Sequence, residues 1–388
     1  TPYINKQKKR RKMSFNLIPI INLEDAFDPH KKPQFLKNLR HALLNVGFLL
    51  LVGHEQYGPS QQDYANIKQQ AVEFFALPEN VKKNCEMIHS PHFLGYTRLA
   101  NEITASKADW REQIDLATEL PAPKEGEPLY RQIEGPNLWP DEKYAPTFRP
   151  VVTHYIEKMT QLSTTFRKLV CEAIGLAPSS LDPYFKENQQ CKMKLIAYPD
   201  DAEAKSRGLS LDAAEQEGDT HELGQGVGPH RDSDLLTYIY QASEHKDSLQ
   251  VQNFQGEWIS VDNIPGALVV AVGQTLEAIT NGVCKATIHR VTTPCAGTGT
   301  RLSIPFFQTI DLDSHKSAVS DIPSEVLLLK DERDKRITDW GVDVGFQFTP
   351  DISKHPIGHA VFRNRIKSHQ DVAARWYPDV LKQVLREY

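Results

Sequence analysis

The sequence lacks an apolar run long enough to cross a membrane. Its densest apolar stretch, Phe48 to Val52, has only five residues, whereas a transmembrane helix needs about 20. It also has no excess of positive charge, because 45 Lys and Arg stand against 50 Asp and Glu, a formal net charge of −5. A mildly acidic chain is a poor ligand for the nucleic-acid backbone. We therefore expect neither a membrane nor a nucleic acid as a partner.

Cysteine is scarce, and its pattern excludes two further classes of protein. The five cysteines form no CxxC pair and are odd in number: Cys85, Cys171, Cys191, Cys284 and Cys295. This argues against a disulfide framework and against a structural zinc cluster. No apolar segment typical of a secretory signal precedes the first patterned residues. We expect a cytoplasmic protein.

The N-terminus carries a basic run, Lys6 to Lys12. Such a run is typical of a nuclear-localisation signal or a polyanion-binding patch. The alternative, which we favour, is a disordered basic tail over residues 1–16 whose first 12 residues are not native, because Met13 is a plausible initiator.

The remaining chain divides by its hydrophobic pattern. Residues 17–150 alternate short strands with amphipathic helices, including one opened by a capping box at Ser60 and Asp63. Residues 151–190 hold a long supporting helix that ends at Gly175. From 191 to 310, short apolar runs follow one another without intervening helices, interrupted by a polar loop insertion over 200–227. Residues 311–388 form an extension whose final helix, broken at Pro378, is expected to pack on the outside. This order predicts a mainly β fold with an antiparallel core and helical support.

The strongest chemical signal is His230–Arg231–Asp232, which leads directly into an apolar strand. Residues i and i+2 of a strand point to the same side, so this imidazole and this carboxylate can bind one ion. His289 lies in another strand-like run and is the expected third ligand. Two histidines and one carboxylate are the ligand set of non-haem iron(II) oxygenases, although zinc accepts them too.

The HxD pattern alone is weak, because this chain contains it two more times, at His245–Lys246–Asp247 and His369–Gln370–Asp371. The first lies in a charged link and the second at the start of a helix, so neither is expected to bind metal. His221, in a polar loop, is the nearest rival ligand.

Arg301 and Ser303 follow His289 by twelve and fourteen residues and share one strand face. A guanidinium grips a carboxylate through two hydrogen bonds, and a hydroxyl adds a third. A keto dicarboxylic acid could therefore bind the metal at one end and Arg301 and Ser303 at the other. The hydroxyl of Tyr198 could reach the same carboxylate; its other interpretation is a buried strand aromatic.

These residues lie within a wider series of motifs that resembles the isopenicillin N synthase-like branch of the 2-oxoglutarate/Fe(II)-dependent dioxygenases. The matching segments, in the order typical of that family, are IPIINL, GFLLLVGHE, FFALPENVKK, GYTRL, DWREQIDL, NLWP, AYP, GPHRDSDLLTYIYQ, LQVQ, GEWISV, IPGALVVAVG, IHRVTTP and RLSIPFF. The resemblance implies a double-stranded β-helix (jelly-roll) core, an N-terminal α/β region and a C-terminal helix. It also implies iron ligands His230, Asp232 and His289, with Arg301, Ser303 and Tyr198 at the 2-oxoglutarate carboxylate. The chain departs from its relatives at Gly273–Gln274, at Ser248 and in the long insertion before His230.

The resemblance implies a monomeric enzyme of secondary metabolism that uses Fe(II), 2-oxoglutarate and O2 to oxidise a C–H bond of a small organic substrate. Succinate and CO2 are the co-products, and hydroxylation, desaturation and ring formation all remain open. The alternative within the same class is an oxidase independent of 2-oxoglutarate, in which Arg301 and Ser303 bind the substrate carboxylate. A non-catalytic binding module and a zinc hydrolase are disfavoured by the complete ligand set and by the lack of an HExxH motif. Candidate pocket residues are Tyr238, Tyr240 and Phe307.

Overall fold

The computed structural model describes residues 14–104, 107–207, 225–315, 319–337 and 354–386. Two predictions, the basic tail up to Lys12 and the rival ligand His221, lie outside these ranges. Within them, no helix combines the length and the apolar character that crossing a membrane requires.

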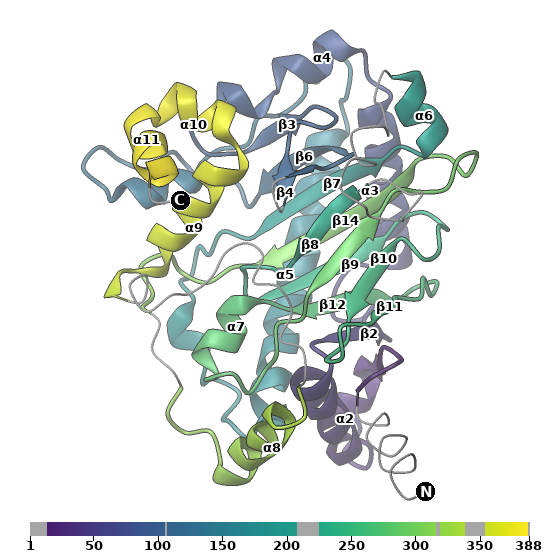
Figure 1. The fold of residues 1–388 in the computed structure, drawn as a ribbon, viewed down its shortest axis with the longest axis vertical. Helices are drawn as coiled ribbons and strands as arrows, with labels where there is room; N and C mark the ends of the chain where they lie inside the picture. Colours follow the sequence, from purple (N-terminus) through teal and green to yellow (C-terminus); the bar gives the residue numbers. More distant parts are fainter. Residues whose placement is uncertain (1–13, 105–106, 208–224, 316–318, 338–353, 387–388) are drawn as a thin grey trace, which may run out of the picture.

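The core consists of two β-sheets that face each other (Figure 1). In the order of the strands, the larger sheet contains β1 (Ile20–Asn22), β2 (Phe48–Val52), β12 (Leu268–Val272), β9 (Leu236–Gln241), β14 (Arg301–Gln308), β7 (Lys192–Tyr198), β6 (Glu112–Ala117) and β3 (Gly95–Thr97). The smaller sheet contains β11 (Trp258–Ser260), β10 (Leu249–Gln252), β13 (His289–Thr292) and β8 (Gln225–His230). A separate hairpin joins β4 (Ile103–Thr104) to β5 (Lys107–Ala108). All pairings within the two core sheets are antiparallel except that of β1 with β2, so the predicted antiparallel jelly-roll core is confirmed.

Helices cover the outer face of the larger sheet. The long helix is α5 (Phe148–Ala173), beside α2 (Lys32–Asn45) and α3 (Gln61–Phe75). It begins two residues before Pro150, which is tolerated in a first helical turn because its missing N–H has no partner there. The shorter helices are α4 (Glu79–Asn84), α6 (Asp201–Ser206), α7 (Gln274–Ile279), α8 (Ser324–Asp334), α9 (Ile357–Ser368), α10 (Gln370–Trp376) and α11 (Pro378–Arg386), with 3-10 turns η1 (Leu23–Phe27), η2 (Met87–His89), η3 (Leu129–Ile133) and η4 (Asp182–Tyr184).

Local sequence signals explain the helix boundaries. The Ser60 side chain accepts a hydrogen bond from the backbone of Asp63, whose carboxylate accepts one from the backbone of Ser60, so the predicted capping box is present. Gly175, with φ of +82°, follows the end of α5 in the left-handed conformation that glycine adopts without strain. The predicted loop over 200–227 is wrong at both ends, because α6 occupies its start and β8 begins at Gln225.

Alternation along the strands produces two cores. In β2, Leu49 and Leu51 belong to the core between the sheet and the helices, whereas Phe48 and Leu50 belong to the core between the two sheets. Successive side chains of a strand point to opposite faces, so the apolar run predicts burial on both sides. The inner core is incomplete at its centre, where polar side chains face a cavity.

Candidate active site

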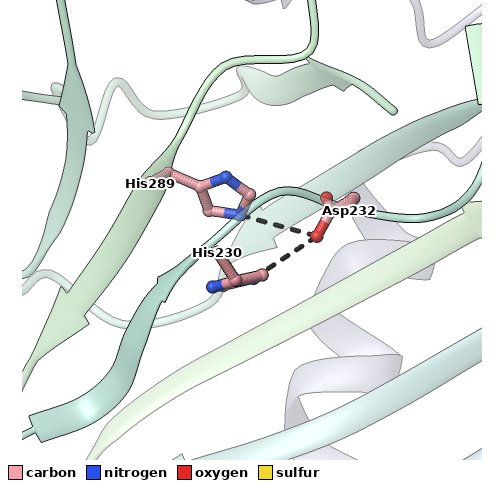
Figure 2. A group of neighbouring side chains, drawn as sticks. All are labelled: His230, Asp232 and His289. Atoms are coloured by element: carbon pink, nitrogen blue, oxygen red, sulfur yellow. Dashed lines mark ion pairs between the residues drawn. The ribbon is translucent and has the colours of Figure 1, made fainter. Parts of the chain in front are cut away.

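Three predicted ligands meet between the two sheets. The ligand atoms of His230, Asp232 and His289 all lie within 4.8 Å of one another (Figure 2). His230 ends β8 and His289 begins β13, and these residues are direct partners in the antiparallel register. Asp232 follows on the loop between β8 and β9. We call these residues the triad.

Hydrogen bonds fix the orientation of both imidazoles. Nδ1 of His230 lies 2.8 Å from the carbonyl of Gly228, and Nδ1 of His289 lies 3.3 Å from the carbonyl of Thr287. A carbonyl can only accept, so both Nδ1 atoms carry a proton, and Nε2 is the nitrogen of each ring that is turned toward Asp232 and can bind an ion. Those Nε2 atoms lie 3.4 Å and 3.5 Å from the same oxygen, Oδ1 of Asp232. The donor atoms therefore converge on one point, as an ion requires.

The charges of the triad also suit a cation. Burial lowers the pKa of His289 to about 4, and repulsion from His230 acts in the same direction. Burial opposes the ionisation of Asp232, but the two histidines outweigh it and hold its pKa well below the usual value. At neutral pH the triad thus presents an ionised carboxylate and a neutral imidazole at His289, which is the state that a metal ion needs.

A second group of predicted residues lies on the inner face of the larger sheet. Arg301 on β14 pairs directly with Tyr198 on β7, and its guanidinium carbon lies 5.2 Å from the centre of the Tyr198 ring. Ser303 is two residues further along the same face. Arg301 is 2% exposed, and its Nη2 donates to Gln241 at 3.3 Å. Its buried Nη1 has no hydrogen-bond partner among the described residues. We call Tyr198, Arg301 and Ser303 the candidate carboxylate clamp.

Comparison with known proteins places this geometry in a family. The profile of the 2OG-Fe(II) oxygenase superfamily matches residues 213–310, and that of the N-terminal region of non-haem dioxygenases in morphine synthesis matches residues 18–142. The 2-oxoglutarate-dependent dioxygenase frbJ of Dothideomycetidae sp. (strain 11243) is 43% identical over 97% of this chain and 96% of its own length. This chain belongs to the 2-oxoglutarate/Fe(II)-dependent oxygenases.

A more distant relative supports this assignment, and a solved structure shares the fold. Homoarginine-6-hydroxylase 2-ODD-C23.1 of Arabidopsis thaliana is 31% identical over 66% of this oxygenase and 72% of its own length. The crystal structure of a full-length Neurospora crassa protein in complex with alpha-KG matches the fold with a TM-score of 0.66 and 20% identity, over 90% of this chain and 96% of that one. The oxygenase is an enzyme that uses Fe(II), 2-oxoglutarate and O2. This finding disfavours the oxidase independent of 2-oxoglutarate.

The oxygenase encloses a cavity of about 700 Å³ that both the triad and the candidate clamp line. This volume is in the range of sites for small molecules. Phe307 lines the cavity, as predicted, but Tyr238 and Tyr240 belong to the core under the helices. The prediction for these two tyrosines is wrong because they lie on the outer face of β9, while Thr237 and Ile239 point inward.

The C-terminal extension also contributes to the cavity. The final helix is predicted to pack on the outside, and this is wrong for Val384 of α11, which lines the cavity. Val361 and Arg365 of α9 line it too. In Figure 1 these helices, in yellow, lie beside β3 and β6. Aromatic contacts hold them there: the ring of Phe93 stacks on that of Tyr377 at 5.8 Å.

The other two HxD motifs do not approach the triad. His245 contacts Ser243 and the carbonyls of Thr298 and Gly299. His369 is buried, with Nε2 lying 3.8 Å from Glu102. Their interpretation as structural residues is consistent with these contacts.

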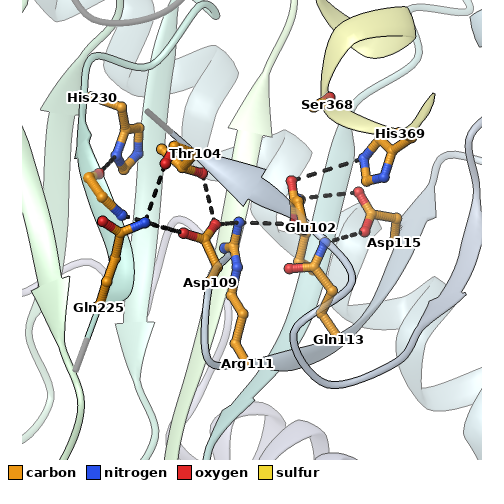
Figure 3. A network of polar contacts seen from close by, with 12 residues as sticks. Glu102, Thr104, Asp109, Arg111, Gln113, Asp115, Gln225, His230, Ser368 and His369 are labelled. Carbon is orange, nitrogen blue, oxygen red and sulfur yellow. Dashed lines mark hydrogen bonds and ion pairs between the residues drawn. The ribbon is translucent and has the colours of Figure 1, made fainter. Parts of the chain in front are cut away.

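A buried polar network, which the sequence patterns did not reveal, supports the strand that carries His230 (Figure 3). The carboxylate of Asp109, 0% exposed, accepts hydrogen bonds from the side chain of Gln225 at 2.9 Å and the backbone of Gly228 at 3.3 Å, both on β8. It also accepts from Thr104 at 2.6 Å and Arg111 at 3.1 Å. Since the carbonyl of Gly228 in turn orients His230, Asp109 supports the first residue of the triad. Asp109 and Arg111 lie in the segment DWREQIDL, which matches the family. That match gives no role to either residue.

The network continues from Arg111 to the C-terminal extension. Arg111 pairs with Glu102 at 2.8 Å, and Glu102 with Lys194 at 3.5 Å. Lys194 pairs with Asp115 at 3.4 Å, and Asp115 with Arg365 at 3.3 Å. Each of these buried charges has a partner, as burial in a protein interior requires.

The departure at Gly273–Gln274 leaves the triad intact. A Cβ atom at Gly273 would lie 1.8 Å from the carbonyl oxygen of Asp234, so only glycine fits against the loop that carries Asp232. The backbone N–H of Gln274 donates to the carbonyl of Asp232 at 2.8 Å, and its side chain donates to that of Arg231 at 3.3 Å. These two hydrogen bonds from Gln274 hold the loop that carries Asp232 in place.

Proposed function

We propose that this oxygenase holds iron(II) through Nε2 of His230, Oδ1 of Asp232 and Nε2 of His289, and that it oxidises a C–H bond of a small organic substrate. The observation that carries the proposal is the convergence of three metal-binding atoms. The remaining polar atom of each of these side chains is already hydrogen-bonded to the protein. Bound iron(II) would supply the redox chemistry that activates dioxygen. The protein's own residues orient the ligands and exclude water, and no general base is required.

The candidate carboxylate clamp would bind the far carboxylate of 2-oxoglutarate. The unpaired Nη1 of buried Arg301 supports this assignment, because an unsatisfied buried donor is unfavourable by about 1–3 kcal/mol. A carboxylate satisfies it together with Nη2, in the two-point geometry that guanidinium favours. Ser303 would add a hydroxyl donor, and Tyr198 would pack against the guanidinium from the paired strand.

We propose hydroxylation as the outcome. In balanced form, R–H, O2 and 2-oxoglutarate give R–OH, succinate and CO2. Two Arabidopsis thaliana relatives, 31% and 28% identical, are named homoarginine-6-hydroxylases, which supports hydroxylation over desaturation and ring formation.

We further propose that the enzyme acts as a cytoplasmic monomer in secondary metabolism, on a small molecule, with neither a nucleic acid nor a membrane as partner. One chain supplies both the triad and the candidate clamp, which supports a monomer. Residues 191–310 would form the catalytic core, supported by 17–150, 151–190 and 311–388. The buried free thiols of Cys85, Cys171, Cys191 and Cys284 suit a reducing compartment.

Succinate counting tests this function. The purified protein, loaded with Fe(II) under air, should release succinate only when 2-oxoglutarate is added, and His230→Ala should abolish the release. Substrate oxidation at full rate without 2-oxoglutarate would contradict the proposal.

A further inference from the structure

The cavity contains a second cationic position, far from Arg301. Lys192 begins β7 and lines the cavity, and it pairs with Phe307 of β14. Tyr198, which pairs with Arg301, is six residues further along β7. At about 3.3 Å per residue, Lys192 and the candidate clamp lie roughly 20 Å apart along the sheet. A carboxylate at Lys192 therefore cannot be the one that the clamp holds.

Lys192 differs from its basic neighbours in having no carboxylate partner among the residues that the structure describes. Lys194 and Arg365 both pair with Asp115. In the described part of the chain, no carboxylate lies within ion-pair distance of Lys192, whose ammonium group donates instead to the carbonyl of Ile133 at 2.5 Å. Three donors on an ammonium group leave room for a further acceptor. An anion from outside the chain would fill this position.

A carboxylate without a partner lies in the same region. Asp234 follows the triad loop and lines the cavity. Among the described residues, its side chain has neither a hydrogen bond nor an ion pair. Lys192 and Asp234 both line this cavity, and the described residues show no ion pair between the two. Opposite charges held apart inside a cavity match a ligand that carries both charges.

The register relates this position to the triad. Thr237, Phe307 and Lys192 occupy one row across β9, β14 and β7, and the Thr237 hydroxyl donates to Asp232. At about 4.8 Å between strands, Lys192 lies roughly 10 Å across the sheet from Thr237. A molecule of amino-acid size spans this distance. Apolar side chains of Phe307, Ile310 and Leu312 line the same cavity.

We propose that the substrate is a free α-amino acid, whose carboxylate binds Lys192 and whose ammonium group binds Asp234, with its side chain directed to the triad. An α-amino acid carries both charges on one carbon, and a peptide linkage on either side removes one of them. This assignment rests on the proposed oxygenase function and adds the substrate class to it.

Binding measurements on the complete protein test the assignment without turnover. The protein is loaded with Mn(II) and 2-oxoglutarate and titrated in a calorimeter with the twenty proteinogenic l-amino acids and l-homoarginine. At least one should bind, and its amide and its N-acetyl derivative should bind roughly 10- to 100-fold more weakly, since each loses a charge-assisted hydrogen bond.

Variants assign each group to its residue. Lys192→Met should weaken binding of the free amino acid but leave binding of its amide unchanged. Asp234→Asn should weaken binding of the free amino acid but leave binding of its N-acetyl derivative unchanged. Lys168→Met, at an exposed position of α5, is the matched control, and the affinity for 2-oxoglutarate should stay constant in all three proteins. Should a variant fail to fold, the ligand derivatives test the same contacts on the unaltered chain.

The two levels of the proposal fail differently. Binding of no amino acid, or equal binding of the free acid, its amide and its N-acetyl form, would overturn the amino-acid assignment while 2-oxoglutarate-dependent succinate release persists. Loss of succinate release itself would overturn the oxygenase function and the assignment together.

Discussion

The hydroxyl of Thr237 donates a 2.6 Å hydrogen bond to Oδ2 of Asp232. This bond occupies one carboxylate oxygen and leaves Oδ1 directed at the two histidines. Thr237 lies on β9, so the larger sheet fixes the triad carboxylate that the loop after β8 carries.

Thr237→Val removes this hydroxyl and keeps the shape of the side chain. We expect the affinity for Fe(II), measured anaerobically by metal titration, to fall roughly 10- to 100-fold, as is typical when a residue that orients a metal ligand is lost. Thr237→Ser keeps the hydroxyl and should bind nearly as well as the unaltered enzyme. An unchanged affinity in the valine variant would show that Thr237 does not orient Asp232.

Arg301→Met should raise the KM for 2-oxoglutarate by at least about 10-fold, because the substitution removes a charge-assisted contact with the carboxylate. Burial lowers the pKa of Arg301, so the free enzyme bears an unfavourable charge there. The same variant should therefore be at least as stable to urea as the unaltered protein. A normal KM for 2-oxoglutarate would remove Arg301 from the clamp.

Lys192→Met should stabilise the protein in a pH-dependent way. Burial, with repulsion from Arg365, lowers the pKa of Lys192 from 10.5 to about 7. Between these two pH values the unfolded chain holds a proton that the folded protein has released, so stability rises with pH across that window. Below pH 7 the unaltered protein bears the full penalty of the buried ammonium.

The gain in unfolding free energy from Lys192→Met should thus be on the order of 5 kcal/mol below pH 7 and should vanish above about pH 10.5. Urea denaturation at several pH values measures it. A loss of stability at neutral pH would indicate a structural role for Lys192 and would weaken its assignment as a substrate anchor.

Asp109→Asn should lower both stability and metal affinity. Burial raises the pKa of Asp109, so loss of its charge is not the cost. The amide replaces one acceptor oxygen by a donor, which removes a hydrogen bond from Arg111 or from β8 and is unfavourable by about 1–3 kcal/mol. It also weakens the hydrogen bond from the backbone of Gly228 to residue 109, and the carbonyl of Gly228 orients His230. Thermal unfolding and Fe(II) titration would check both effects. Thr104→Val, which removes one donor and no charge, should give a much smaller change in each, and equal effects in the two variants would contradict a specific role for Asp109.

Short-range signals predicted the triad and much of the core. The i, i+2 spacing of His230 and Asp232 places both on one side, and the apolar strand that follows distinguishes them from the other HxD motifs. Alternation also predicts the inner face of β14, where Arg301, Ser303 and Phe307 are separated by even numbers of residues. The prediction for Tyr238 and Tyr240 is wrong because Thr237 and Ile239 occupy the inner face of β9, which turns both tyrosines toward the helices.

Other parts of the site depend on contacts between distant segments. Asp109 meets β8 across more than one hundred residues, and α9 reaches the cavity from the far end of the chain. Lys192 and Asp234 look like ordinary charged residues in the sequence. Only the three-dimensional structure shows that the basic neighbours of Lys192 pair with carboxylates and that Lys192 pairs with none among the described residues.

A crystal structure grown without oxygen, with Fe(II) and 2-oxoglutarate present, tests the central claim most directly. We predict one iron ion bound by Nε2 of His230, Nε2 of His289 and Oδ1 of Asp232, with the far carboxylate of 2-oxoglutarate on Arg301 and Ser303. An iron ion bound elsewhere, or either imidazole turned away from Asp232 in the loaded enzyme, would contradict it.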